Sequence, residues 1–197
     1  SLEIVNIRDS ALDKYKTVDD TPFGGGSGMV IRADIIANSL DKNISNKNEQ
    51  IIYLSPKGKK FNQTYAKTMM SKNVNIICGH FEGVDQRLIE TRNIEEVSVG
   101  DFILSGGEIG AFLVIDTIVR LIPGVLGNSN SLAEETFERD LLEYPQYTKP
   151  QKWKGKEVPD VLLSGDHVKI KDWRLSQSED ITRRRRPDLW EKYKKSK

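Results

Sequence analysis

Three short segments that are rich in glycine or proline have the composition of a binding pocket walled by main-chain atoms. They are LSPKG (54–58), CGHFEG (78–83) and VGDFILSGG (99–107), and each follows a run typical of a β-strand. Glycine lets a ligand come close to backbone amides and carbonyls. In parallel α/β sheets, ligands bind beyond the carboxyl ends of the strands. The segments therefore predict a pocket for a flat heteroaromatic ring; the alternative is that all three are only tight turns.

Two familiar nucleotide-binding signatures do not fit this chain. The pattern GxxxxGK[ST] is absent, which excludes a P-loop. FGGGSGM (23–29) has the glycine density of a dinucleotide-binding turn, but the preceding TVDDTP is not a strand. This segment is interpreted as a mobile loop or an anion-binding backbone nest, with simple turn glycines as the alternative.

The cysteine and the histidines offer little chemistry of their own. Cys78 is the only cysteine, so no intramolecular disulfide can form and a reducing cytoplasm is expected. It ends the apolar run VNIIC, which favours a buried structural cysteine over a catalytic thiol. His80 and His167 are too far apart in the chain to indicate a metal site, so none is predicted.

Strand-like and helix-like segments alternate from residue 50, and this alternation must position the three loops. Strands are predicted at 50–54, 74–78 and 95–104, the last broken by a loop, and helices at 62–73, 85–92 and 108–122. Such an order is typical of an α/β domain with a largely parallel sheet.

The last third of the chain differs in charge. Residues 137–197 carry 16 Lys and Arg against 11 Asp and Glu, whereas the whole chain has a net charge of only +1. The Pro/Lys/Gly-rich crossing at 149–159 precedes a helical pattern over 166–195 that includes four consecutive arginines. Basic residues interleaved with Trp173, Trp190 and Tyr193 suit RNA; the alternative is core tryptophans and solvated arginines. The predicted domains are 1–127 and 137–197, joined by a linker at 128–136.

The overall composition is that of a globular protein. Of the 197 residues, 37% are hydrophobic and 30% charged. No apolar run approaches the roughly 18 residues of a membrane span, and no signal-peptide pattern opens the chain. A membrane role is therefore not expected.

Seven blocks in chain order resemble one enzyme family. They are TVDDTPFGGGSGM (17–29), IYLSPKGK (52–59), CGHFEGVDQR (78–87), SVGDFILSGGE (98–108), IPGVLGN (122–128), YPQYTKP (144–150) and VPDVLLSGDHVKIKDWR (158–174). Together they are similar to bacterial tRNA (guanine-N1)-methyltransferase, the TrmD family of the SPOUT superfamily.

The resemblance implies an α/β fold whose parallel sheet is tied in a trefoil knot, followed by a small helical domain that grips tRNA. It implies a cytoplasmic homodimer with active sites at the subunit interface. The enzyme would move a methyl group from S-adenosylmethionine to N1 of the guanosine immediately 3′ of the anticodon, which maintains the reading frame. Whether Mg²⁺ assists is left open.

The resemblance also assigns roles to residues. Guanine N1 carries a proton, so a base must remove it, and a cation should stabilise the charge that develops on O6. The matching positions are Glu135 as the base, where the family commonly has aspartate, and Arg120 as the cation, with Glu134 as the alternative base. Cofactor contacts are expected from Leu54, Ser55, Pro56, Gly79, Glu82, Val99, Gly100, Asp101, Phe102, Ile103, Leu104, Gly106, Gly107 and Gly110. Contacts with the target guanosine are expected from Asp19, Asp20, Gly25 and Gly28.

The first residues depart from the family pattern. The strand and helix with which the family opens have no counterpart in SLEIVNIRDS (1–10). If they are truly absent, the sheet would lose a strand and expose an edge. Two rival functions also stay open: a SPOUT methyltransferase for another RNA position, and an RNA-binding module without catalysis.

Overall fold

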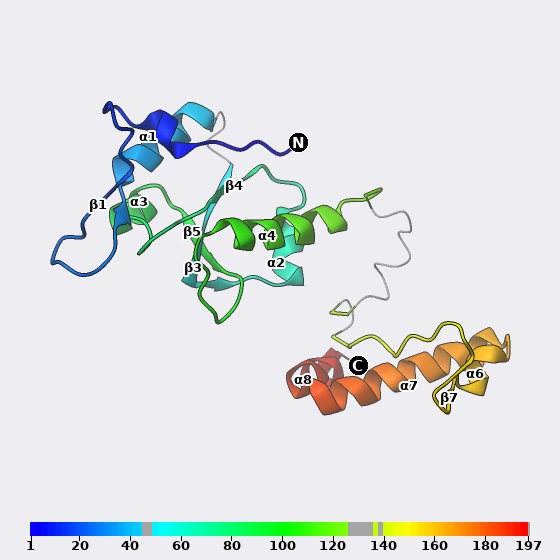
Figure 1. Cartoon of the computed structure of the whole chain (residues 1–197). Coiled ribbons are helices and arrows are strands. Elements are labelled where there is room, and N and C mark those ends of the chain that lie inside the picture. Colours follow the sequence, from blue (N-terminus) through cyan, green and yellow to red (C-terminus); the bar gives the residue numbers. More distant parts are fainter. Residues whose placement is uncertain (45–48, 126–135, 138–139, 197) are drawn as a thin grey trace. The chain divides into compact units, whose positions relative to one another are not determined.

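The chain forms two compact units, Ser1–Val125 and Leu126–Lys197. The computed structural model describes residues 1–44, 49–125, 136–137 and 140–196, and Figure 1 traces their elements along the sequence. Among these residues, no helix combines the length and the apolar character needed to cross a membrane.

The first unit is built on a three-stranded parallel sheet in the order β4-β3-β5. The central strand is β3 (Gln50–Lys60), with β4 (Val74–Ile77) on one side and β5 (Glu95–Ser98) on the other. This confirms the predicted parallel α/β arrangement. The short strand expected at 101–104 is wrong, because those residues form a bend and irregular chain.

Two layers of helices cover the sheet (Figure 1). Helices α1 (Ala33–Asn43) and α3 (Gln86–Thr91) contact each other, as do α2 (Gln63–Met69) and α4 (Glu108–Leu121). Successive side chains of β3 point to opposite faces of the sheet and so pack against both helix layers. Ile52 is fully buried with α2 and α4, whereas Ile51 and Tyr53 pack against the cluster formed with α1 and α3.

Capping side chains and a proline mark the ends of several helices. The side chain of Asn62 accepts a hydrogen bond from Tyr65 N at 2.9 Å and caps α2, and Asp85 caps α3 through Arg87 N at 2.9 Å. Such caps satisfy amides that the first turn of a helix leaves without partners. Helix α4 ends at Leu121, shortly before Pro123, as the sequence predicts.

A small hairpin precedes α1. After the 3-10 turn η1 (Ile7–Ser10), strand β1 (Asp19–Asp20) pairs antiparallel with β2 (Val30–Ile31), and the glycine-rich segment connects them. The hairpin is joined to the sheet domain because Ile31 N donates to Gly83 O at 2.9 Å and Asp85 N donates to Ile31 O at 3.0 Å.

The described residues of the second unit form a hairpin and three helices. Strands β6 (Lys152–Trp153) and β7 (Lys156–Glu157) are followed by α6 (Asp160–Leu163), α7 (His167–Arg185) and α8 (Pro187–Ser196). The predicted helical stretch at 166–195 is therefore two helices, because Pro187 lacks the amide that would continue α7. The hairpin was not predicted.

Candidate functional site

A cavity of about 270 Å³ lies where the three predicted loops meet. This is close to the lower end of the roughly 300–1,000 Å³ typical of small-molecule pockets. Its walls come from β3, from the segment after β4 and from the segment after β5. The lining residues are Tyr53, Leu54, Ser55, Pro56, Gly79, His80, Phe81, Glu82, Gly83, Val97, Ser98, Val99, Gly100, Phe102, Ile103, Leu104, Ser105, Gly106, Gly107 and Gly110.

The first wall is an irregularity inside β3. Leu54 and Lys59 both lie opposite Val97 of β5, so residues 55–58 are left outside the pairing register. Pro56 is tolerated there because an unpaired bulge position needs no amide hydrogen. The strand was expected to end at Leu54, and that boundary is wrong: β3 resumes its pairing and runs to Lys60.

The other two walls touch each other through their backbones. Gly107 N donates to Gly79 O at 2.9 Å, and a Cβ added to Gly107 would lie 2.6 Å from the Cα of Cys78. A Cβ on Gly79 would lie 2.7 Å from the ring of Tyr53. These glycines are therefore required by neighbouring protein atoms, in addition to any ligand.

A hydrogen bond between two side chains also joins the same two walls. His80 Nε2 lies 2.6 Å from Glu108 Oε1, and Glu108 occupies the first turn of α4. The hydrogen bond to His80 holds the pKa of Glu108 below its ordinary value. Burial, with Glu108 nearby, raises the pKa of the Cys78 thiol, which disfavours a nucleophilic thiolate.

The lowered pKa of Glu108 predicts how the pair depends on pH. A carboxyl whose pKa is depressed by folding stabilises the fold above its unfolded pKa of about 4.3 and loses that contribution as pH falls through the folded value. We expect Glu108→Gln to lower Tm at pH 7 and to have a shrinking effect below about pH 4. Thermal melts of both proteins from pH 3 to 8 check this; a Tm difference that stays constant across the range would contradict it.

The β1–β2 hairpin borders the pocket through Glu82. A Cβ on Gly28 would lie 2.6 Å from the Glu82 Cγ, and Glu82 N donates to Met29 O at 3.0 Å. Gly25 is more remote, with open space around it, and Asp20 is exposed and accepts a hydrogen bond from Thr21 N at 2.7 Å. Gly28, a predicted substrate residue, thus lies beside the pocket wall, and Asp19 pairs with Ile31, whose amide donates to the lining residue Gly83.

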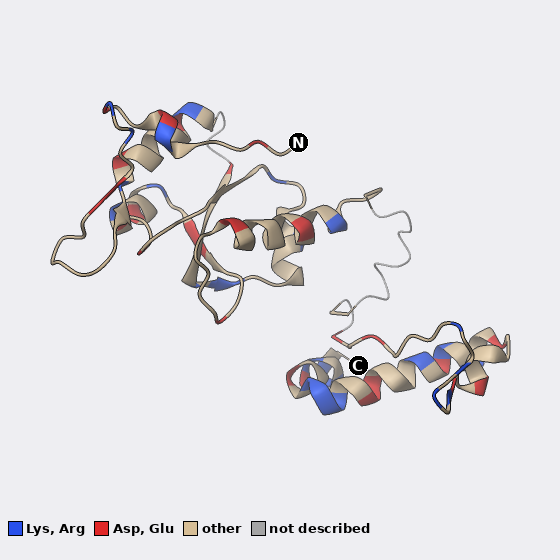
Figure 2. Ribbon diagram, viewed as in Figure 1, with Lys and Arg blue, Asp and Glu red and all other residues tan. Residues whose placement is uncertain are grey.

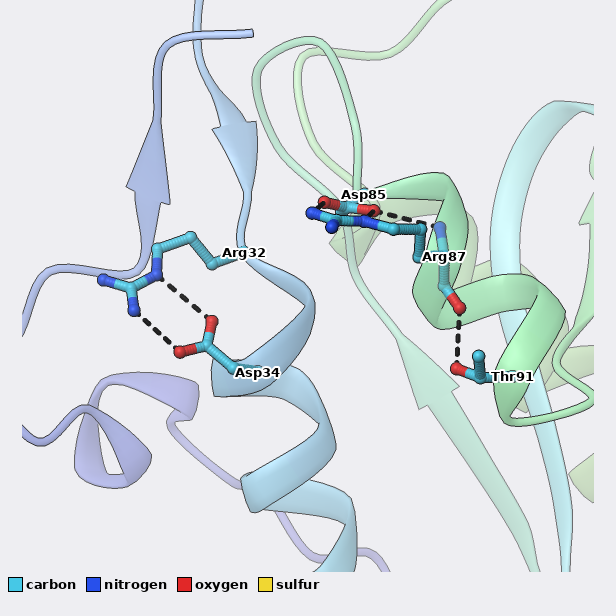
Figure 3. A network of polar contacts seen from close by, with 5 residues as sticks. All are labelled: Arg32, Asp34, Asp85, Arg87 and Thr91. Atoms are coloured by element: carbon cyan, nitrogen blue, oxygen red, sulfur yellow. Dashed lines mark hydrogen bonds and ion pairs between the residues drawn. The ribbon is translucent and has the colours of Figure 1, made fainter. Parts of the chain in front are cut away.

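Two bidentate ion pairs hold the chain beside this junction (Figure 3). Arg32 donates to Asp34 at 3.1 and 2.7 Å, and Arg87 donates to Asp85 at 3.0 and 2.6 Å. Each guanidinium lowers the pKa of its partner carboxyl. The two pairs lie at the start of α1 and at the start of α3, the helices that follow the hairpin and the second loop.

Arg120 lies on the exposed side of α4, which also carries an apolar stripe formed by Ile109, Phe112 and Leu113. Positions 109, 113, 116 and 120 follow helical spacing, and Ile109 and the neighbouring Phe112 are 65% and 64% exposed. The opposite side of α4 carries the fully buried Val114. Arg120 therefore projects from the side of the helix that faces away from the core of its own domain.

Comparison of the sequence with known proteins shows the family of this chain. The family described as tRNA (Guanine-1)-methyltransferase TrmD matches residues 1–192. A tRNA (guanine-N(1)-)-methyltransferase from Pelagibacter ubique (strain HTCC1062) is 67% identical over 196 residues, covering 99% of this chain and 86% of the relative. The chain belongs to the TrmD family. A tRNA (guanine-N(1)-)-methyltransferase from Bartonella tribocorum is 52% identical, and the match covers 100% of this chain and 84% of the relative. One from Wolbachia pipientis wMel is 51% identical, and the match covers 96% of this chain and 82% of the relative.

Most of the positions that resemble cofactor contacts of TrmD enzymes meet at the cavity. Asp101 is the exception: the lining does not include it, and its carboxylate lies 3.0 Å from Lys60 Nζ at an exposed position. Glu135 and Glu134 lie outside the described residues. Within the described part of the chain, no cluster of three or more His, Cys, Asp or Glu side chains is placed to hold a metal ion.

Several lining residues were missed by the sequence analysis. The ring of Tyr53 lies where a side chain at residue 79 would go, and burial together with the charge of Glu96 raises the pKa of the Tyr53 hydroxyl. The alternation of Tyr53 with the buried Ile52 along β3 was a sequence signal that could have identified Tyr53. His80 pairs with a residue 28 positions away, and nothing in the spacing indicates that contact.

Proposed function

We propose that this chain transfers a methyl group from S-adenosylmethionine to N1 of the guanosine immediately 3′ of the anticodon of tRNA, and so maintains the reading frame. The observation that carries the proposal is the cavity between three glycine- or proline-containing segments in a chain of the TrmD family. Because the proposed substrate is tRNA, we propose a cytoplasmic location.

The pocket has the chemical groups that such a cofactor needs. Ser98–Gly107 and Gly79–Gly83 offer backbone donors and acceptors to an adenine ring, and Leu54 and Phe102 offer apolar contacts. Glu82 would provide a negative charge for the cationic methionine end. When bound, S-adenosylmethionine supplies a methyl group on a sulfonium, and the protein supplies placement and electrostatics.

The residues that act on the guanine are proposed from the family match. Glu135 would take the proton from N1, because N1 is a poor nucleophile while protonated. Arg120 would stabilise the negative charge that develops on O6. Its place on the outward face of α4 supports an active site that is completed by a second subunit.

A methyl-transfer assay tests the proposed function. The chain is incubated with labelled S-adenosylmethionine and two tRNA transcripts that differ only in G or A next to the anticodon, with Mg²⁺ or with a chelator. Transfer to the G transcript alone, at N1, is expected; transfer to both or to neither overturns the proposal. The Mg²⁺ arms decide whether the ion assists.

We also propose the knotted fold and two-fold dimer of the SPOUT superfamily. The knot is proposed from the family match. The exposed apolar stripe of α4 supports the dimer, because contiguous apolar patches on soluble proteins mark interaction sites. The basic Leu126–Lys197 unit would grip the tRNA.

Phe112 tests the dimer. We expect Phe112→Asp to convert the dimer to a monomer and to reduce methyl transfer more than tenfold, since a buried unpaired charge is strongly destabilising at an interface. Sedimentation and activity are measured together. Asp116→Ala, on the same exposed face, is the matched control and should leave the dimer intact. A fully active Phe112→Asp monomer would refute the proposed interface.

A further inference from the structure

The β6–β7 hairpin displays a tryptophan that the second unit does not bury. Trp153 lies directly opposite Lys156, and the connecting residues Lys154 and Gly155 have φ of +49° and +75°. Two consecutive positive φ angles are typical of a tight type I′ turn. Trp153 is 62% exposed. A ring this large on a short hairpin is available for contact with another molecule.

Positive charge surrounds this ring. Residues 149–157 contain four lysines and one glutamate, and Figure 2 shows the basic residues of the hairpin. The Lys154 ammonium lies 4.9 Å from the centroid of the Trp153 ring, whereas Lys152 pairs with Glu157 at 2.7 Å. Among the residues that the structure describes, Lys154 and Lys156 have no ion-pair partner. An aromatic face beside such cations suits a single-stranded nucleic acid, whose bases stack while its phosphates bind the cations.

The aromatic residues that the sequence analysis favoured are less accessible. Tyr193 is 9% exposed and its hydroxyl donates to Glu179 at 2.7 Å, so it belongs to the packing of α7 and α8. Trp173 and Trp190 are half-buried. The interpretation of Tyr193 as a stacking residue is therefore wrong for this structure.

Much of the arginine run is also engaged within the unit. Arg183 and Arg184 both pair with Asp180, at 3.0 and 2.5 Å. Arg186 pairs with Asp188 at 2.6 Å and lowers the pKa of that carboxyl to about 2. These acids offset part of the positive charge of the run, whereas residues 149–157 hold four lysines against a single carboxylate.

We propose that Trp153 stacks on an unpaired base of the substrate tRNA, while Lys154 and Lys156 bind the phosphates beside that base. This inference rests on the proposed function, in which tRNA is the substrate, and it assigns part of the tRNA contact to a hairpin remote in sequence from the cofactor pocket. Stacking supplies affinity that tolerates any base, and the lysines make the contact dependent on salt.

Binding of a tRNA transcript with G next to the anticodon tests the inference. Trp153→Ala should raise the Kd for this tRNA about five- to a hundredfold, and Trp153→Phe should restore most of the affinity, because stacking requires a ring. Lys154→Gln and Lys156→Gln should each reduce the slope of log K against log salt by about 0.7, whereas Trp153→Ala should leave it unchanged. Lys171→Gln, an exposed lysine of α7, is the matched charge control and should change the Kd less than twofold.

Fluorescence gives an independent readout. In a chain with Trp173 and Trp190 replaced by phenylalanine, Trp153 is the one remaining tryptophan, and its emission should be quenched when the same tRNA binds. Wild-type affinity of Trp153→Ala, or unquenched emission from bound complexes, overturns the inference. If the wild-type chain methylates tRNA while Trp153→Ala binds it normally, only this inference fails; if the wild-type chain binds no tRNA, the proposed function fails with it.

Discussion

Gly107→Ala should weaken the binding of S-adenosylmethionine between about fivefold and a hundredfold. The added Cβ would lie 2.6 Å from the Cα of Cys78 and 2.9 Å from the Gly79 amide nitrogen. Both are backbone atoms, so relief requires one loop to move away from the other. Overpacking of this kind costs about 1–3 kcal/mol, and the movement would widen the cavity at its second and third walls. Calorimetric titration with S-adenosylmethionine measures the effect.

Asp101→Ala, in the same loop, is the matched control that shows whether any substitution in this loop weakens cofactor binding. Asp101 has a side chain that is 84% exposed, and its contact is an exposed ion pair with Lys60. Such pairs contribute about 0–1 kcal/mol, so Asp101→Ala should alter the Kd less than about threefold. Thermal melts of both variants show whether the domain remains folded. Unchanged affinity in folded Gly107→Ala would mean that contact between the two loops does not shape the pocket.

The sequence predicted the parts of the fold that depend on periodicity. The buried runs around Ile52 and Ile77 and the helical spacing of 108–122 each reflect a face turned toward one core. These signals are local and strong. They also predicted that three glycine-bearing segments would meet at one pocket, because a parallel sheet brings the ends of its strands together. Two of the segments follow β4 and β5 as predicted, whereas the first lies in an irregularity inside β3.

The sequence did not predict features that depend on register or on distant partners. The bulge in β3 arises because Leu54 and Lys59 share one opposite residue, Val97, and composition cannot distinguish this from the end of a strand. The same holds for the contact between His80 and Glu108. The role of glycine also differs from the prediction. Gly107 accommodates the backbone of Cys78, whereas the sequence analysis attributed the missing side chains to a ligand, with tight turns as the alternative.

The β6–β7 hairpin shows why short elements escape such analysis. Its strands have two residues each, too few for alternation to be recognised, and its turn residues include a lysine in the left-handed region. Lysine and proline dominate the surrounding composition and favour irregular chain. The exposure of Trp153 could therefore be seen only in three dimensions.

Glu135→Gln should reduce kcat for methyl transfer by about a hundredfold to ten-thousandfold, the range that a positioned general base contributes. The amide has the size of the carboxyl group but cannot accept the N1 proton. Affinity for S-adenosylmethionine should stay within about twofold of the wild type, because the proposed cofactor contacts come from other segments. Single-turnover kinetics with saturating tRNA, together with cofactor titration, separate the two quantities. Turnover in the variant should rise with pH, since hydroxide can then remove the proton that the side chain no longer accepts.

Two further variants decide whether the role belongs to this residue. Glu135→Asp keeps the carboxylate and the residue type that resembles the family pattern, with nearly the same intrinsic pKa, about 3.9 against about 4.3. It shortens the side chain by one methylene, and a displacement of about 1 Å can cost on the order of a hundredfold in rate. Glu135→Asp should therefore retain more activity than Glu135→Gln, yet less than the wild type. Glu134→Gln is the neighbouring control and should leave kcat within about threefold of the wild type. If Glu134→Gln were inactive and Glu135→Gln fully active, the base would be Glu134, and the register of the family match across 131–137 would have to shift by one residue.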